Sequence, residues 1–110
     1  MNILSERKRL SPLERLIESM RRMRKLQSEW QHIEDVTQAR VMIASARTRY
    51  ERAKAEGKNV TGWSPERVLS VTAGFKKLCR ALNDESTWKL LNRKERAFIA
   101  AAVDFVGRAK

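Results

Sequence analysis

The sequence predicts an all-α protein, and three observations support this fold class. Apolar residues recur every three to four positions along most of the chain, which is the spacing of a helix face. Ser11-Pro12-Leu13-Glu14 and Asn92-Arg93-Lys94-Glu95 have the residue types of helix capping boxes. No alternating apolar and polar pattern, typical of a strand, appears. We therefore expect a single helical domain over residues 1–110, in which residues 1–10 form a basic, flexible segment.

The first expected element is a long helix over about residues 12–56. Ser11 caps it, Pro12 takes the first helical position, and neither Pro nor Gly follows until Gly57. At about 100° per residue, one side of its first part carries Leu16, Met20, Met23, Leu26 and Trp30. The apolar side then shifts by well over about 90°, to Val36, Ala39, Ile43, Ala46, Tyr50 and Ala53. We expect a bend, a break or a change of packing partner between Trp30 and Val36, with Trp30 in the core.

Two to three shorter helices are expected after a loop at residues 57–64. Ser64-Pro65 begins a helix whose apolar side holds Val68, Val71, Thr72, Phe75, Leu78, Cys79 and Leu82. Residues 86–91 are expected to form a short helical turn that carries Trp88. The last helix is expected to run to about Val106, with an apolar side of Phe98, Ala101, Ala102 and Phe105.

The net positive charge of the chain indicates which kinds of partner it binds. Lys and Arg number 24 and Asp and Glu 13, which gives a formal net charge of +11 over 110 residues. Such an excess favours nucleic acid first, an anionic membrane second and an acidic protein groove third. No apolar run is long enough for a membrane span, and the N-terminus lacks the apolar stretch of a secretory signal. We expect a cytoplasmic protein with no membrane partner.

Residue types that carry catalysis are nearly missing. His32 is the only histidine, which disfavours His-rich metal sites and Ser-His-Asp triads. We expect His32 to be solvated or locally bonded. Cys79 is the only cysteine, which excludes an internal disulfide, and it is expected to be a buried, inert thiol. The sequence therefore predicts no enzyme, no catalytic residue, no metal site and no cofactor.

The densest group of cations lies on the long helix. This N-terminal cluster consists of Arg21, Arg22, Arg24 and Lys25. Glu14 and Glu18 share its side of the helix, and Glu18 is placed for a favourable i, i+4 pair with Arg22. The cluster is either a solvated helix face or a secondary site for binding nucleic acid.

A second group of cations is not neutralised by nearby acids. It consists of Lys76, Lys77 and Arg80, on the side of the expected second helix opposite its apolar residues. Residues 57–83 carry five cations, among them Lys58, and one acid, Glu66. Because an uncompensated patch keeps its positive potential, we expect phosphate contact here; the alternative is that the charge serves solubility.

Two further features are candidates for binding a partner. Arg40, Arg47 and Lys54 recur every seven residues and would line one side of the long helix, where Arg49 and Arg52 could join them. They would follow a nucleic-acid backbone or an acidic partner. Trp63 lies in a loop with nearby glycines. It could stack on a base, anchor in a partner's pocket or clamp its own loop.

Two functions fit these features. The first is a small basic accessory protein, without catalysis, that contacts nucleic acid through phosphate with little sequence specificity; DNA is the preferred partner over RNA. The second is a protein-binding modulator or inhibitor, of the kind that phages make, which docks helices on a larger DNA- or RNA-processing enzyme. Self-association into a homo-oligomer is a third way to cover two apolar sides of one helix.

Overall fold

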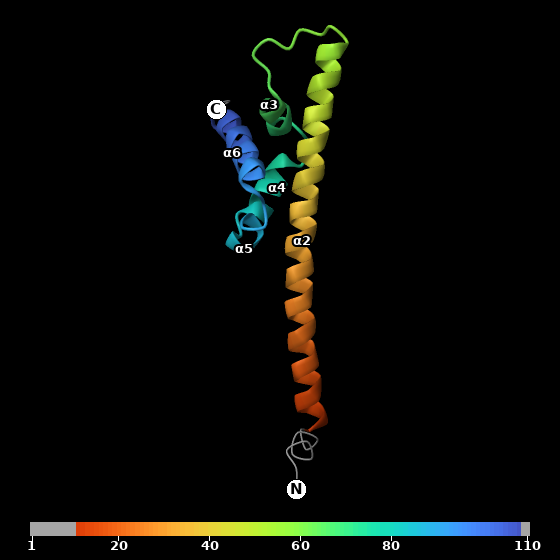
Figure 1. Ribbon diagram of the computed structural model, residues 1–110. Coiled ribbons are helices and arrows are strands. Elements are labelled where there is room, and N and C mark those ends of the chain that lie inside the picture. Colours follow the sequence, from red (N-terminus) through yellow and green to blue (C-terminus); the bar gives the residue numbers. More distant parts are fainter. Residues whose placement is uncertain (1–10, 109–110) are drawn as a thin grey trace. The chain divides into compact units, whose positions relative to one another are not determined.

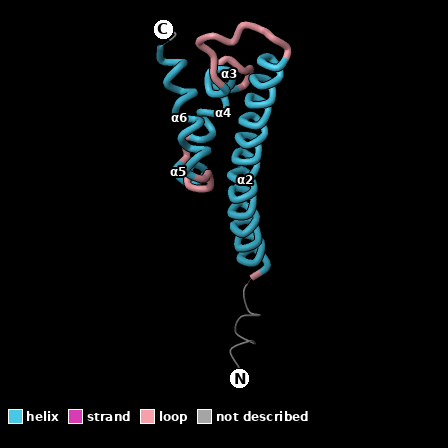
Figure 2. The backbone as a smooth tube through the Cα atoms, turned by 45° about the horizontal axis from the view of Figure 1, so that its top comes forward, coloured by secondary structure: helices cyan, strands magenta, loops and turns pink. Residues whose placement is uncertain are grey.

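The computed structural model of the protein describes residues 11–108, so the flexible segment expected at 1–10 lies outside the described residues (Figure 1). Helices and loops, without a strand, make up this described part (Figure 2). Its helices are α2 (Pro12–Ala55), α3 (Pro65–Ser70), α4 (Phe75–Leu82), α5 (Glu85–Trp88) and α6 (Arg93–Arg108). The predicted all-α class with a long first helix is confirmed, and four shorter helices follow α2 where two to three were expected.

Local sequence signals set both ends of α2. The Glu14 backbone N–H donates to Ser11 Oγ over 3.1 Å, as expected of an N-cap serine. At the other end Gly57 has φ 77°, a left-handed conformation that glycine adopts without strain. The N–H groups of Gly57 and Lys58 donate to the carbonyls of Lys54 and Ala53. This is a Schellman motif, which satisfies the last carbonyls of the helix.

The described chain separates at residue 31 into two compact units. In the first unit every described residue, 11–31, is exposed. Trp30 is 64% exposed, so the prediction that it lies in the core is wrong. Helical periodicity identifies an apolar side but does not say whether anything covers it.

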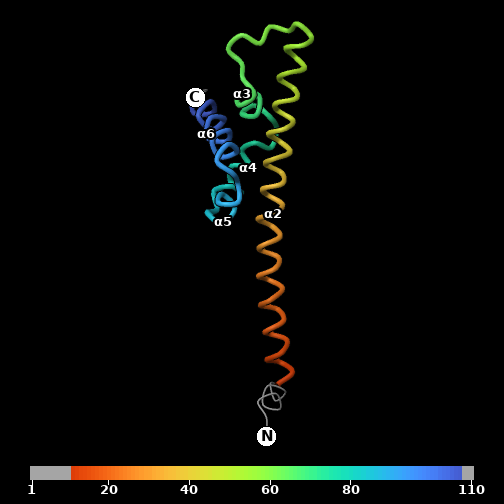
Figure 3. The backbone as a smooth tube through the Cα atoms, in the orientation of Figure 1, coloured from red at the N-terminus to blue at the C-terminus, as the bar shows by residue number. Residues whose placement is uncertain are grey.

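The second unit, residues 32–110, holds the hydrophobic core. Its buried apolar residues on α2 are Val36, Ala39, Met42, Ile43 and Ala46. The shorter helices and the turn before α6 add Leu69, Phe75, Leu78, Leu82, Leu91, Phe98, Ile99 and Ala102. Figure 3 shows α3 and α6 side by side. The expected apolar side from Val36 to Ala46 is therefore confirmed.

The helix α2 has no break between Trp30 and Val36, since all its residues from Pro12 to Ala55 are helical. What changes there is the environment of the side chains, from exposed to buried. A break is thus excluded, and a bend stays a prediction.

The helix expected to run from Pro65 to Leu82 is interrupted. Helix α3 ends at Ser70, and α4 begins after Gly74, which has φ 89°. The hydroxyls of Ser70 and Thr72 donate to the carbonyls of Arg67 and Val68, and such bonds compete with regular helix geometry. Val71, expected on the apolar side, is 64% exposed.

His32 makes a long-range bond that no local sequence pattern indicates. Its Nδ1 atom lies 2.6 Å from Oγ1 of Thr87, and Thr87 is the one polar side chain that is buried among the described residues. The expectation of a solvated or locally bonded histidine is therefore wrong. The bond joins residues 55 positions apart, and it satisfies a hydroxyl that would be costly to bury alone.

The second capping box forms as predicted, and it holds an ion pair. The N–H of Asn92 donates to the Glu95 carboxylate, and the N–H of Glu95 donates to the Asn92 side chain, each over 2.8 Å. Arg40 Nε lies 2.8 Å from Glu95 Oε2. The hydrogen bond from Arg40 lowers the pKa of Glu95, although partial burial opposes this shift. The pair fixes the start of α6 against α2.

Replacing Glu95 by glutamine is expected to make stability less dependent on pH. Glutamine can still complete the capping box, but it cannot form the ion pair with Arg40. Because folding lowers the pKa of Glu95, its contribution is fully present above the ordinary glutamate pKa of about 4.3 and is lost as the pH falls through the lower, folded value. In urea titrations the free energy of unfolding of the wild type should exceed that of Glu95→Gln from about pH 5 to 7. The difference should vanish at lower pH. A constant difference at all pH values, or the same behaviour in the exposed control Glu51→Gln, would contradict this account.

Candidate nucleic-acid interface

The second group of cations, Lys76, Lys77 and Arg80, lies on α4, and we call it the α4 patch. It faces outward because the opposite side of the helix is buried. Phe75, Leu78 and Leu82 are buried in the core, so Lys76, Lys77 and Arg80 are exposed together. Helix α4 contains no acidic residue. None of the three cations has an ion pair within the described residues. The patch therefore presents uncompensated positive charge, as the sequence predicted.

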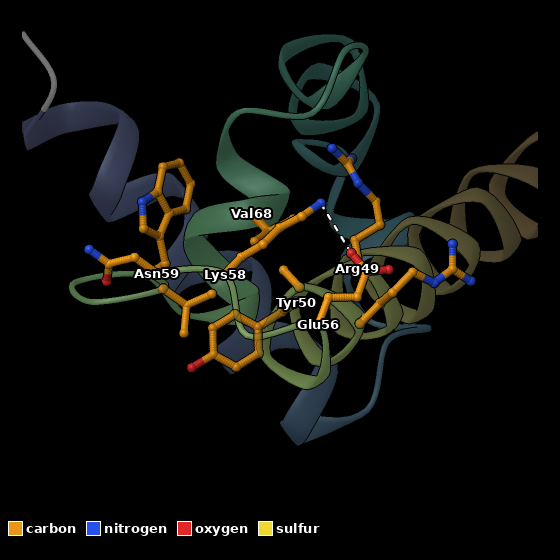
Figure 4. Close-up of a pocket in the computed structure, with 10 residues that line it drawn as sticks. Arg49, Tyr50, Glu56, Lys58, Asn59 and Val68 are labelled. Atoms are coloured by element: carbon orange, nitrogen blue, oxygen red, sulfur yellow. Dashed lines mark ion pairs between the residues drawn. The ribbon is translucent and has the colours of Figure 1, made fainter.

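A surface pocket of about 430 Å³ lies where α2 ends and the following loop turns back (Figure 4). Its lining residues are Arg49, Tyr50, Arg52, Ala53, Glu56, Lys58, Asn59, Val60, Trp63 and Val68. Three of them are cations and one is an acid. We call this feature the loop pocket. It combines positive charge with two aromatic side chains, which is the combination that single-stranded nucleic-acid sites use.

Hydrogen bonds between residues close in sequence fix the conformation of the loop. The N–H of Thr61 donates to Oδ1 of Asn59 over 3.0 Å, and the N–H of Trp63 donates to the carbonyl of Val60 over 2.9 Å. Gly62 has φ 78°, which a residue with a side chain would adopt only under strain. These features place Trp63 directly before α3, whose N-cap Ser64 accepts from the N–H of Arg67.

Trp63 is 39% exposed, and one face of its ring is occupied. The guanidinium carbon of Arg67 lies 4.5 Å from the ring centroid, a cation–π geometry. The same guanidinium donates to the carbonyl of Gly62 over 2.9 Å. Trp63 thus does clamp its own loop, which is one of the three roles considered for it. The part of the ring that lines the loop pocket can still contact a ligand.

Arg49 connects the loop pocket with the segment before the α4 patch. Its guanidinium lies 3.4 Å from Oγ1 of Thr72, and the carbonyl of Thr72 accepts from the N–H of Phe75, the first residue of α4. Within the pocket Lys58 Nζ pairs with the Glu56 carboxylate at 3.2 Å (Figure 4). The positive charge of the pocket therefore rests chiefly on Arg49 and Arg52.

The three cations spaced by seven residues on α2, Arg40, Arg47 and Lys54, have different contacts. Arg40 forms the ion pair with Glu95 and also donates to the carbonyl of Leu90. The guanidinium carbon of Arg47 lies 5.0 Å from the ring centroid of Phe98. Lys54 is exposed without an ion pair in the described residues. Two of these side chains thus serve the internal packing of the second unit, and Lys54 is the best placed for a partner.

All four residues of the N-terminal cluster are exposed. Arg22 forms the expected pair with Glu18, at 3.3 Å. For Arg21, Arg24 and Lys25 the described chain offers no ion pair. Nearby acids therefore neutralise less of the positive charge of this cluster than the presence of Glu14 and Glu18 suggested.

Other chemistry is sparse in the part of the chain that the structure describes. Residues 11–108 hold no group of three or more His, Cys, Asp or Glu side chains that could bind a metal ion. Cys79 is half-buried beside an apolar surface pocket of about 480 Å³ between α4, α5 and α6. Burial raises the pKa of this thiol, which lowers its reactivity. In the described residues no helix is both long and apolar enough to cross a bilayer.

The chain matches no protein-family model, no curated protein and no solved structure.

Proposed function

We propose that this chain is a small, basic, non-catalytic accessory protein of the cytoplasm that associates with nucleic acid or with a nucleic-acid-processing complex. It acts mainly through phosphate contacts, with little sequence specificity, and DNA is the preferred partner. The observation that carries the proposal is the α4 patch, three exposed cations on one helix that contains no acid.

The loop pocket supports the same function. Arg49 and Arg52 supply charge for a phosphate, and Tyr50 and Trp63 supply aromatic surface for a base. Stacking on aromatic side chains tolerates every base, since each base has a π-face. A site built from cations and stacking surfaces therefore binds without reading sequence, unlike a helix that reads base edges in the major groove.

The wild-type protein is expected to bind a labelled duplex and a labelled single strand, and to lose affinity steeply as salt rises. Each phosphate contact releases condensed counterion, so the log–log slope is roughly −0.9 per contact on duplex and −0.7 on single strand. With about three to six contacts the duplex slope should lie between roughly −3 and −5. Scrambling the duplex sequence should change affinity by less than about tenfold. Failure to bind either probe at low salt would contradict the proposal.

The alternative is a protein-binding modulator or inhibitor that docks helices on a larger enzyme. The exposed apolar side of α2 within residues 12–31 favours it. Capture of partners from lysate, with and without nuclease, separates the two functions. Partners that disappear with nuclease support the accessory protein. Partners that persist with nuclease, and are lost when Met23 is replaced by glutamate, support the modulator.

A further inference from the structure

Within the described residues, nothing packs against a large apolar surface on the first unit. This N-terminal stripe consists of Leu13, Leu16, Ile17, Met20, Met23, Leu26 and Trp30, each between 42% and 67% exposed. Together they expose roughly 700 Å², more than the largest apolar patch of a typical monomer. The area is close to the roughly 800 Å² that each partner buries in a stable interface. The stripe therefore has the size of a protein–protein interface.

Four residues of the stripe, together with Ser19, have the spacing of a paired helix. Leu16, Met23 and Trp30 recur every seven residues, and Ser19 and Leu26 each follow three residues after one of them. This is the a and d spacing of a coiled coil, in which side chains of one helix insert between those of the next.

We propose that a second copy of this chain covers most of the N-terminal stripe, and that the two α2 helices pair antiparallel over residues 16–30. Antiparallel pairing sets Trp30 against the small Ser19 of the second copy, and Met23 against Leu26 of the second copy. Large and small side chains then alternate across the interface, which favours close packing. Parallel pairing in register would instead set the two Trp30 rings against each other.

Antiparallel pairing also places opposite charges next to each other at the edge of the stripe. Arg22 and Glu29 directly precede Met23 and Trp30, so both flank the stripe on one side. Antiparallel pairing brings Arg22 next to Glu29 of the second copy, and two-fold symmetry forms this contact twice. Parallel pairing in register would place Glu29 next to Glu34 of the second copy, where like charges repel.

The present partner of Arg22 does not prevent this contact. Arg22 pairs with Glu18 at 3.3 Å, and their side chains are 77% and 55% exposed, a setting in which an ion pair contributes little. A guanidinium has five N–H donors, so it can bind Glu18 and Glu29 of the second copy together. Glu29 itself has no ion pair within the described residues.

An anionic membrane suits the stripe less well than a second copy. Glu14, Glu18 and Glu29 lie among the cations of the polar side, and anionic headgroups would repel them. The self-complementary pair of Arg22 and Glu29 has no counterpart at a lipid surface.

Sedimentation equilibrium of the full chain tests the proposal, after nuclease and heparin treatment have removed nucleic acid. The wild type should form a dimer whose fraction rises with concentration, and Leu26→Asp should be monomeric. Val41→Asp is the matched control, because Val41 lies on the same helix with 56% exposure against 55% for Leu26; it should leave the dimer intact. A wild type that stays monomeric up to about 1 mM, or equal effects of the two substitutions, would overturn the proposal.

Charge exchange tests the antiparallel orientation. Arg22→Glu and Glu29→Arg should each weaken the dimer by about tenfold. An equimolar mixture of the two variants should restore wild-type association, since both contacts of the mixed dimer again join a carboxylate to a guanidinium. No recovery in the mixture would overturn this orientation. Binding of the monomer to phosphatidylserine-containing vesicles, lost in Leu26→Asp, would assign the stripe to a membrane instead. None of these outcomes depends on nucleic-acid binding, which is measured separately.

Discussion

Leu69→Ala should lower the free energy of unfolding by about 2 to 5 kcal/mol. Leu69 is 0% exposed and is among the largest fully buried side chains among the described residues. It is also the one residue of the six-residue helix α3 that is buried. So short a helix is unstable alone, and its position depends on this anchor. Small domains have about 5 to 15 kcal/mol of net stability, so the loss would be a large fraction of the total.

Val71→Ala is the matched control for this experiment. It also removes an apolar side chain two residues further along the chain, but Val71 is 64% exposed. Its effect should stay within about 0.5 kcal/mol. Urea unfolding followed by circular dichroism measures both variants. Similar destabilisation by the two substitutions would mean that α3 is not anchored through Leu69.

The parts of the fold that were predictable are those that depend on neighbouring residues. Ser11 and the reciprocal pair of Asn92 and Glu95 cap helices by contacts three residues apart. Gly57 ends α2 through its own left-handed backbone. These signals are local, so the sequence displays them directly.

The parts that were not predictable depend on distant residues. His32 bonds Thr87, and Arg40 pairs with Glu95, in both cases across 55 positions. No local pattern marks such a contact. Trp30 shows the related difficulty that periodicity defines a side of a helix, whereas exposure depends on which other segments pack against that side.

For the candidate site, the sequence indicated single residues and not their arrangement. Lys58 and Trp63 were named separately and line one pocket in the structure, and Lys76, Lys77 and Arg80 lie on one exposed helix face. Arg49 and Arg52 were expected to join the row of cations along the long helix, and they also line this pocket. Their position in the pocket does have a sequence signal. Both lie in the last two turns of the helix before Gly57, and the loop that follows Gly57 turns back toward them. The same signal applies to Tyr50, which lies between these two arginines.

Replacing Lys76, Lys77 and Arg80 by alanine is expected to flatten the salt dependence of duplex binding by about two to three log–log units. Affinity at low salt should fall by about tenfold or more. The reason is that α4 carries these cations without any acid, so each can displace a counterion from the phosphate backbone. The exposed positions should keep folding within about 0.5 kcal/mol per site, which thermal unfolding verifies.

Two variants with the same loss of charge decide whether the effect belongs to the α4 patch. One variant tests the N-terminal cluster by replacing Arg21, Arg24 and Lys25 with alanine. The other tests exposed cations on α6 by replacing Arg93, Lys94 and Arg96 with alanine. If binding reflected net charge alone, all three variants would flatten the slope equally. We expect the α4 variant to have the largest effect, because Glu14, Glu18 and Glu29 lie in the same exposed part of α2 as the N-terminal cluster, whereas α4 contains no acid. A larger effect from the N-terminal variant would show that a single ion pair neutralises too little of that cluster, and that its three unpaired cations are the principal contact with phosphate.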